Sequence, residues 1–184
     1  MGIIIGLIVA SFMLYFPYEW CRRRGEDERD YGLKWFMTRE SWRDVVIALA
    51  VTLIPLTIIS LYLWPAEWGG RGLKHPTLWI ALDQLGGGIA AAFIEETFYR
   101  GWLQTLLTRK LGVIPGVLIA TGAFALSHLV VLTGWLRVAT FFPGLVMAVL
   151  RIRGGSVMPS IIYHAVCNVW AVWLAPVPCR NFSH

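Results

Sequence analysis

Long apolar runs alternate along the chain with short segments that carry most of its charge. A helix needs about 20 apolar residues to cross the hydrocarbon core of a bilayer. Six runs approach or exceed this length: Ile3–Trp20, Val45–Trp64, Leu78–Leu107, Gly112–Leu132, Trp135–Leu150 and Val157–Ala175. The pattern predicts an all-α, polytopic bundle of about six transmembrane helices, formed by residues 1–184 as a single domain.

Several of the predicted spans are irregular. The third run is too long for one straight span, so we expect it to tilt or to extend into the interface. The fifth run is short and contains Pro143 and Gly144, which indicates a bent or incomplete span. Pro55 should kink the second helix, because proline removes a backbone donor and crowds the preceding turn. The first run lacks a basic n-region and a small-residue cleavage site, so we expect a retained anchor.

The composition favours a membrane protein over a soluble one. Of the 184 residues, 57% are hydrophobic and 15% are charged, and a soluble domain this small has too little interior to bury that surface. The net charge of +5 raises the alternative of nucleic-acid binding. However, seven of the sixteen Lys and Arg residues lie between the first two runs, as is typical of a cytoplasmic loop. We therefore expect a lipid bilayer around the protein and no nucleic-acid partner.

The distribution of basic residues also predicts an orientation. The odd-numbered loops carry eleven Lys and Arg residues, whereas the even-numbered loops and the C-terminal tail carry four. The positive-inside rule then places the odd-numbered loops in the cytoplasm and both termini outside. Trp20, Trp64 and Trp135 lie at predicted span ends, as expected of residues at the membrane interface.

Three ionisable residues, Glu95, Glu96 and Arg100, lie together in the third run. Each charge at mid-bilayer costs about 2.5–3.5 kcal/mol unless it is paired or neutralised. Glu96 and Arg100 are four residues apart and share a helix face, so we expect them to pair. Glu95 points about 140° away from Arg100. It is left in apolar surroundings, where a carboxylate can become a general base near neutral pH.

Two histidines and an asparagine lie in later runs. His128 follows Phe124 by one helical turn in the fourth run, and Asn168 follows His164 by one turn in the sixth. A single helical histidine is more often structural than catalytic, but two on separate spans, with an asparagine and a glutamate pair, favour a site. Their depths overlap with that of Glu95 when counted at about 1.5 Å per residue from the cytoplasmic side. We expect these polar side chains to meet in one cavity.

Three motifs in this order resemble those of the CAAX-protease and bacteriocin-processing (CPBP) family, also called the ABI family. Its EExxxR motif matches Glu95 to Arg100, followed by Gly101, and its FxxxH motif matches Phe124 to His128. Its third motif, a Phe-Gly run ending in HxxxN, matches Phe141, Gly144, Gly155, Ser156, His164 and Asn168. The resemblance covers about residues 78–175. It departs from the family at two positions where relatives often have Gly and Thr, namely Ala148 and Gly154.

The resemblance implies a glutamate-type intramembrane protease acting on a membrane-associated protein or peptide. In that picture Glu95 and His128 activate a water molecule, and His164 with Asn168 donates hydrogen bonds to the tetrahedral oxyanion. Relatives process prenylated CAAX tails, bacteriocin leaders or C-terminal sorting segments. The family also implies a multi-pass protein of a prokaryotic inner membrane. The implied catalytic residues are Glu95, Glu96, Arg100, His128, His164 and Asn168.

We expect no cofactor. Two histidines and two glutamates could bind zinc, but there is no HExxH spacing, and Asn168 suits an oxyanion donor better than a zinc ligand. Two other functions stay open: a non-catalytic scaffold or immunity-type protein of the same fold, and a proton-coupled transporter. A proton relay needs titratable groups running toward both faces, whereas here they concentrate at one depth.

The remaining polar and sulfur-containing residues are interpreted as structural or solvated. Asp83 lies near the outer end of the third run and His75 precedes Pro76 in a loop. The triplet Gly86-Gly87-Gly88 favours close helix packing over a break that admits substrate. We expect the other residues of this group to fill space or to lie outside the ordered core: Cys21, Cys167, Cys179 and His184.

Overall fold

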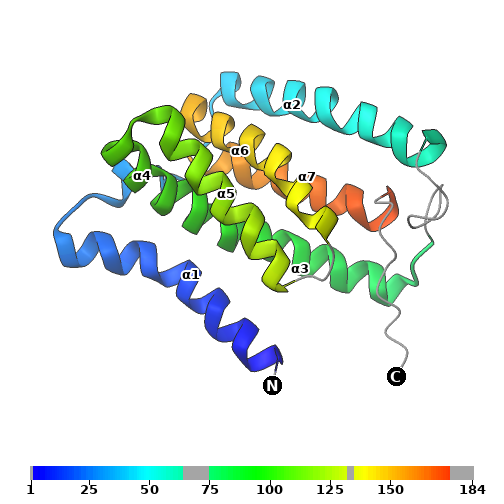
Figure 1. Ribbon diagram of the computed structural model, residues 1–184, viewed down its shortest axis with the longest axis horizontal. Helices are drawn as coiled ribbons and strands as arrows, with labels where there is room; N and C mark the ends of the chain where they lie inside the picture. Colours follow the sequence, from blue (N-terminus) through cyan, green and yellow to red (C-terminus); the bar gives the residue numbers. More distant parts are fainter. Residues whose placement is uncertain (1, 64–74, 132–134, 175–184) are drawn as a thin grey trace.

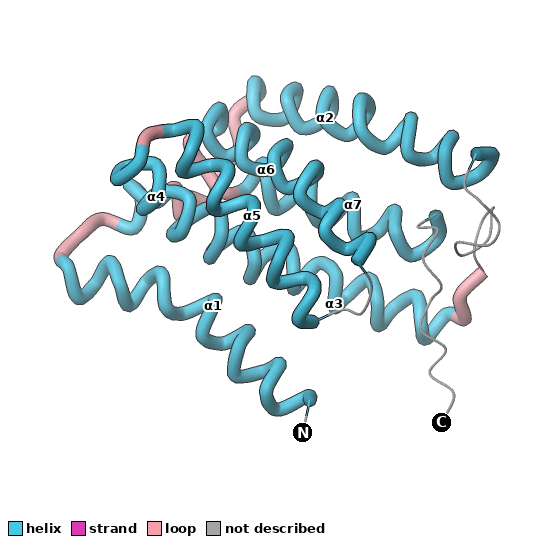
Figure 2. The backbone as a smooth tube through the Cα atoms, in the orientation of Figure 1, coloured by secondary structure: helices cyan, strands magenta, loops and turns pink. Residues whose placement is uncertain are grey.

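The computed structural model describes residues 2–63, 75–131 and 135–174. Within these ranges the only regular secondary structure is helical, joined by short loops and without a strand, which confirms the all-α prediction (Figure 2). The α-helices are α1 (Gly2–Arg24), α2 (Arg39–Ile58), α3 (Leu78–Glu96), α4 (Gln104–Leu111), α5 (Val113–Val131), α6 (Phe141–Gly154) and α7 (Met158–Leu174). The π-helical segments are Ile59–Leu63 and Thr97–Leu103, and the 3-10 segments are Glu28–Tyr31 and Trp135–Thr140.

The described residues form six continuous helices, because the π-helical segment Thr97–Leu103 joins α3 to α4 without a break. Each helix coincides with one predicted apolar run. Three helices are long and apolar enough to cross a membrane: Ile4–Arg24, Arg39–Leu63 and Leu78–Leu111. Two more are apolar but shorter, Val113–Leu129 and Met158–Leu174. Some residues used in the sequence analysis lie outside the described ranges. They are Trp64, Arg71, Lys74, Cys179, Arg180 and His184.

The helix lengths agree with the predicted irregularities. The continuous helix Leu78–Leu111 has 34 residues, so at about 1.5 Å per residue it is longer than a bilayer core of about 30 Å and must tilt or extend beyond it. α6 has 14 residues and is shorter than that core. Pro55 lies within α2, which continues past it and becomes π-helical at Ile59.

The long helix α3–α4 is the centre of the bundle (Figure 1). α7 packs along α3, α5 packs against α4, and α6 lies against both α5 and α7. α2 and α1 occupy opposite edges of the molecule (Figure 1). α2 contacts α7 and α6, whereas α1 contacts the π-helical segment and α3. The helices with the three motifs therefore form the core, and the first two helices flank it.

The contact of α1 with the core is aromatic. The rings of Phe16 and Trp20 pack against Trp102 with centroid distances of 4.9 and 5.6 Å, and Phe12 packs against Phe98 at 6.0 Å. Much of the rest of α1 is exposed.

The contact of α2 with α7 contains hydrogen bonds. Two threonine hydroxyls of α2 each donate to a carbonyl of their own helix, Thr52 to Ala48 and Thr57 to Leu53. The same hydroxyls accept hydrogen bonds from α7. The donors are Tyr163 Oη at 3.0 Å from Thr52 and Trp170 Nε1 at 2.9 Å from Thr57, and Ser60 adds a bond to the Leu174 carbonyl.

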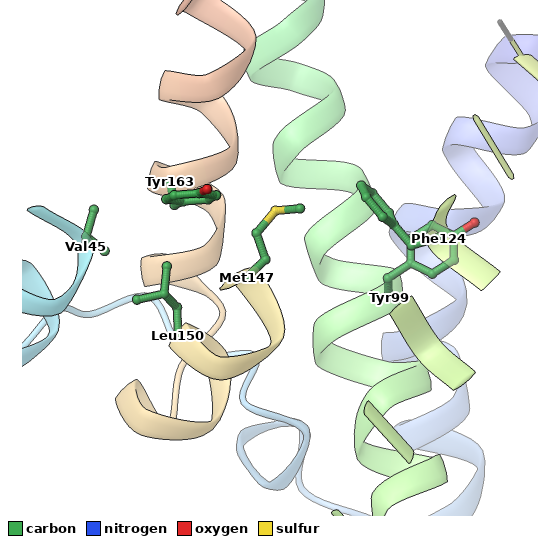
Figure 3. Close-up of a cluster of buried hydrophobic side chains, with 6 residues drawn as sticks. All are labelled: Val45, Tyr99, Phe124, Met147, Leu150 and Tyr163. Carbon is green, nitrogen blue, oxygen red and sulfur yellow. The ribbon is translucent and has the colours of Figure 1, made fainter. Parts of the chain in front are cut away.

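A buried apolar cluster lies between the core helices (Figure 3). Its members are Val45 of α2, Tyr99 of the π-helical segment Thr97–Leu103, Phe124 of α5, Met147 and Leu150 of α6, and Tyr163 of α7. Outside this cluster, many large apolar side chains are exposed on the outer faces of the helices. Apolar residues outside and buried ionisable residues inside are the arrangement expected of a bundle dissolved in lipid.

The segment between α1 and α2 folds back over the basic end of the bundle. Gly32, at φ +68°, accepts a hydrogen bond from the Val157 amide at 2.9 Å, and the Lys34 carbonyl accepts one from Ser156 Oγ at 2.5 Å. Leu33 lies over Gly101, where an added Cβ would approach Leu33 Cδ2 to 2.5 Å. Gly101, which follows the EExxxR motif, is therefore a docking point for this loop.

Candidate active site

Glu95 and Glu96 end α3, and Arg100 lies in the π-helical segment that follows. π-helical turns are rare and occur frequently at functional sites. Sequence reasoning did not predict this segment, because the pattern of apolar residues indicates a helix without indicating whether its hydrogen bonds are i−4 or i−5. All three ionisable side chains of the EExxxR motif thus lie where the helix changes its geometry.

Glu96 is the centre of a fully buried polar network. Its Oε2 lies 3.5 Å from Arg100 Nε, and its Oε1 lies 2.9 Å from His164 Nδ1. The side chains of Glu96 and Arg100 are 0% exposed. The structure therefore contains the Glu96–Arg100 pair expected from their spacing, and it adds His164 as a partner. A carboxylate paired with a guanidinium is an acceptor, so His164 donates its Nδ1 proton to Glu96.

Arg100 is held by three helices. Besides Glu96, its Nη2 donates to the Gly144 carbonyl on α6 at 3.2 Å, and its guanidinium lies 4.3 Å from the centroid of the Phe124 ring on α5. An added Cβ on Gly144 would lie 3.2 Å from Arg100 Nη2 and 2.8 Å from Thr121 Cγ2. A glycine is therefore favoured at this position of the third motif, because the Thr121 methyl group and the Arg100 guanidinium leave little room for a side chain.

Phe124 connects the two histidines. Its ring contacts His128 at 4.6 Å and His164 at 5.8 Å, and it also packs edge-on against Tyr99 at 5.4 Å. Sequence reasoning used Phe124 only as a motif position. Its structural role is to separate Arg100 from the more accessible part of the site while positioning both imidazoles.

Glu95 lies apart from this network and faces His128. Its Oε2 is 4.0 Å from His128 Nε2, and the two side chains are 25% and 16% exposed, in contrast to Glu96 and Arg100. His128 Nδ1 lies 2.9 Å from the Phe124 carbonyl. Because a carbonyl can only accept, Nδ1 carries a proton there, and in the neutral imidazole Nε2 presents a lone pair toward Glu95. Glu95 is also within electrostatic range of His164.

Asn168 is tied to α3 at a different level. Its Nδ2 donates to the Gly88 carbonyl at 2.8 Å, nearly two helical turns before Glu95. A Cβ on Gly88 would lie 3.0 Å from Asn168 Cβ, whereas Gly86 and Gly87 have open space around them. Close packing therefore applies to Gly88 within the triplet. The described contacts join Asn168 to α3 but not directly to Glu95 or His128.

Gln104 is a buried polar residue that sequence reasoning missed. Its Nε2 donates to the Ala148 carbonyl at 3.2 Å, one turn beyond the bond from Arg100 to Gly144. Its position four residues after Arg100 would have been a usable signal, because it places a second polar group on the same helix face. Ala148 is 0% exposed and contributes a carbonyl, so its departure from glycine leaves the contact intact.

The side chains interpreted as structural or solvated lie away from the network. Asp83 and His75 are exposed, Cys21 is buried and Cys167 is half-buried, and both of these cysteines are free thiols. In the described ranges, no group of three His, Cys, Asp or Glu residues is arranged to hold a metal ion.

The arrangement combines three chemical capabilities. Glu95 and His128 have partly exposed side chains, and the Glu95 Oε2 that faces His128 is buried without a hydrogen-bond partner. Glu96 and Arg100 form a buried pair that orients His164. When both carboxylates are ionised, Glu95, Glu96 and Arg100 together carry one net negative charge, which one protonated imidazole would neutralise. Such a set can take a proton from water and stabilise a developing oxyanion.

A comparison with protein families supports the resemblance indicated by the three motifs. The family model described as type II CAAX prenyl endopeptidase Rce1-like matches residues 77–170, slightly more than half of the chain. The match includes all six candidate site residues and excludes α1 and α2. Comparisons with curated proteins and with solved structures gave no match. The Rce1-like family belongs to the CPBP family resembled by the three motifs, and its members act on membrane-associated peptide substrates in the bilayer. The chain is an integral membrane protein of the Rce1-like family of type II CAAX prenyl endopeptidases.

Proposed function

We propose that the protein is an intramembrane endopeptidase in which Glu95 and His128 activate the hydrolytic water. The observation that carries this proposal is the different placement of the two adjacent glutamates. Glu96 is buried with Arg100 and His164, whereas Glu95 is partly exposed and faces the Nε2 of His128 at 4.0 Å. Family membership supports a protease as the activity class.

A single water molecule between Glu95 and His128 would donate one hydrogen bond to each acceptor, because both present lone pairs. One of the two lone pairs on its oxygen would then point toward the carbon of the substrate carbonyl. Glu95 takes the proton as the water oxygen attacks the carbonyl carbon, and it returns that proton to the leaving amine. A positioned general base of this kind contributes about 10²–10⁴-fold to the rate.

His164 and Asn168 are proposed to stabilise the oxyanion. With Nδ1 held by Glu96, His164 would donate from Nε2 to the oxyanion when its ring carries both protons. Asn168 gives one amide hydrogen to Gly88 and retains a second. Each preorganised donor of this kind is worth about 10²–10³-fold in kcat.

Glu96 and Arg100 act through His164 rather than on the substrate. Both side chains are fully buried, so they position the imidazole and fix its tautomer. We propose that no metal takes part, since Asn168 suits an oxyanion donor and the two histidines bond to different partners, Glu96 and the Phe124 carbonyl.

The substrate is proposed to be a membrane-associated protein or peptide with a CAAX-like tail, a leader or a C-terminal sorting segment. The enzyme is proposed to be a multi-pass protein of a prokaryotic inner membrane. A comparison of membrane-protein termini between wild-type cells and Glu95→Ala cells would identify the substrate by the termini that disappear.

Glu95→Gln tests the mechanism. We expect the purified variant to lose about 10²-fold or more of its peptidase activity on peptides of these three types, because the amide cannot accept the proton. Asp83→Asn is the matched control, since it removes an exposed carboxylate from the same helix. Both assays are run with and without a metal chelator, and the wild-type activity is expected to survive chelation.

Undiminished cleavage by Glu95→Gln would refute the assignment of the base. Wild-type protein that cleaves none of the peptides, together with a cellular phenotype rescued equally by Glu95→Ala, would favour the scaffold function. Activity lost on chelation and restored by zinc would favour the metal alternative.

A further inference from the structure

The outer face of the bundle contains a groove between α2 and α6 that the proposed catalysis does not use. Its volume is about 520 Å³, and its lining is apolar apart from Thr52 and a charged pair at one end. Ile47, Ala48 and Val51 of α2 face Val146 and Val149 of α6. Ala48 is the smallest of these side chains, which leaves room between the two helices.

The groove ends at a charged group. Arg153 Nε of α6 lies 2.6 Å from Asp44 Oδ2 of α2, and Arg43 Nη2 lies 3.3 Å from Asp44 Oδ1. Two arginines share the Asp44 carboxylate, and Glu40 of the same helix also interacts with Arg43. Both arginine side chains remain more than half exposed, at 57% and 62%. They are therefore accessible to an anion.

The length of the groove fits one leaflet of a bilayer. From Asp44 to Thr52 along α2 is eight residues, or about 12 Å at 1.5 Å per residue. Half of a hydrocarbon core of about 30 Å is about 15 Å. The charged end lies at the basic end of the bundle, where headgroups would be, and the apolar part extends toward the bilayer centre.

We propose that this groove is a binding site for an anionic phospholipid, with an acyl chain between α2 and α6 and the phosphate on Arg153 and Arg43. Basic pockets between transmembrane helices on the cytoplasmic side bind anionic headgroups by this chemistry. The inference is independent of the proteolytic function, because its site residues lie outside the Glu95–His128 region.

The site also touches the helices that hold the catalytic network. Thr52 lines the groove and bonds to Tyr163 of α7, one residue before His164, while Leu145 follows Gly144, the acceptor for Arg100. Occupancy by a lipid fills the space between the two helices that support this network.

Native mass spectrometry of the detergent-solubilised protein tests the proposal with phosphatidylglycerol and phosphatidylcholine of matched chains. We expect a complex with about one bound phosphatidylglycerol per protein at lipid concentrations where no complex with phosphatidylcholine is detected. Val149→Trp fills the groove and is expected to reduce the bound fraction at least about tenfold. The matched control is Ile119→Trp, at an equally exposed apolar position on α5, and it should leave binding unchanged.

Two substitutions at the charged end are expected to change the affinity for phosphatidylglycerol in opposite directions. Arg153→Gln should weaken binding because it removes a phosphate contact, whereas Asp44→Asn should strengthen it because it frees Arg153 from its carboxylate. Arg29→Gln is the control for net charge, since Arg29 lies in the loop between α1 and α2. If the group only joined α2 to α6, both substitutions would weaken binding alike.

Three outcomes would overturn the proposal. One is equal binding of the two lipids, which would show that the headgroup does not contribute to the affinity. Another is undiminished phosphatidylglycerol binding by Val149→Trp. A third is a dimer that Val149→Trp abolishes, which would identify the groove as an interface between two copies of the chain.

Discussion

Glu95 and Glu96 are adjacent in sequence, yet their carboxylates lie in different surroundings. One residue of helix rotates the side chain by about 100°, which turns Glu96 toward His164 on α7 and leaves Glu95 facing His128 on α5. Glu96 is buried with its counter-charge, whereas Glu95 keeps partial access. The same functional group thus serves for positioning in one case and is proposed for proton transfer in the other.

Gly144→Ala tests the packing of Arg100. Alanine normally stabilises a helix relative to glycine, but here its Cβ would press on Thr121 and Arg100. We expect a loss of about 1–3 kcal/mol of unfolding free energy, as for other overpacked sites, together with reduced peptidase activity. Thermal unfolding in detergent micelles measures the first effect.

Gly122→Ala on α5 is the control for that substitution, because no other heavy atom lies within 4 Å of its added Cβ. It should be neutral or slightly stabilising. Equal effects at both glycines would show that Gly144 matters for helix flexibility rather than for the space that Arg100 occupies.

At the residue scale, the spacing of Glu96 and Arg100 was sufficient to predict their pair, because it lies within one helix. The contacts between helices could not be predicted in the same way. The bonds of His164 to Glu96 and of Asn168 to Gly88 depend on how α7 is placed against α3, and helix spacing within one span does not contain that information. The roles of the six site residues in catalysis remain predictions.

At the scale of elements, apolar run length predicted all six helices, since lipid leaves few other structures for an unpaired backbone. It did not predict that Thr97–Leu103 is π-helical, because apolar run length does not distinguish one helix type from another. The first two helices lie outside the family match, yet α2 is bound to α7, which carries His164 and Asn168. α2 is therefore a support for the site.

The double substitution Thr52→Val and Thr57→Val tests this support. It removes two hydroxyls that accept bonds from α7 and keeps the side-chain shape. Hydrogen bonds between membrane helices contribute about 0.6–1.7 kcal/mol each, so we expect a loss of about 1–3 kcal/mol in stability. Activity should fall less than in Glu95→Gln. Val46→Ala, on an exposed face of the same helix, is the control.

Unchanged thermal stability of the double variant would show that apolar packing alone holds α2 in place. A loss of activity without a loss of stability would instead indicate that the hydroxyls align α7 without contributing to its attachment.

At the scale of the whole molecule, the distribution of basic residues predicts the orientation in the membrane. A cysteine-free protein carrying either Arg29→Cys or His75→Cys tests it, because both positions are exposed and belong to opposite predicted sides. A membrane-impermeant thiol reagent added outside intact cells should label His75→Cys, while Arg29→Cys should react only after the membrane is opened. The reverse pattern would invert the proposed topology.

The sparse, aromatic contact between α1 and the rest of the bundle has a consequence for biosynthesis. α1 leaves the ribosome some eighty residues before Phe98 and Trp102, the residues against which it later packs. It must therefore persist in the bilayer as a lone helix until its partner is translated. An apolar span with little buried surface can do so, because lipid tails solvate its apolar side chains on every face. Assembly of this end of the protein is thus a late docking step between helices that are already inserted.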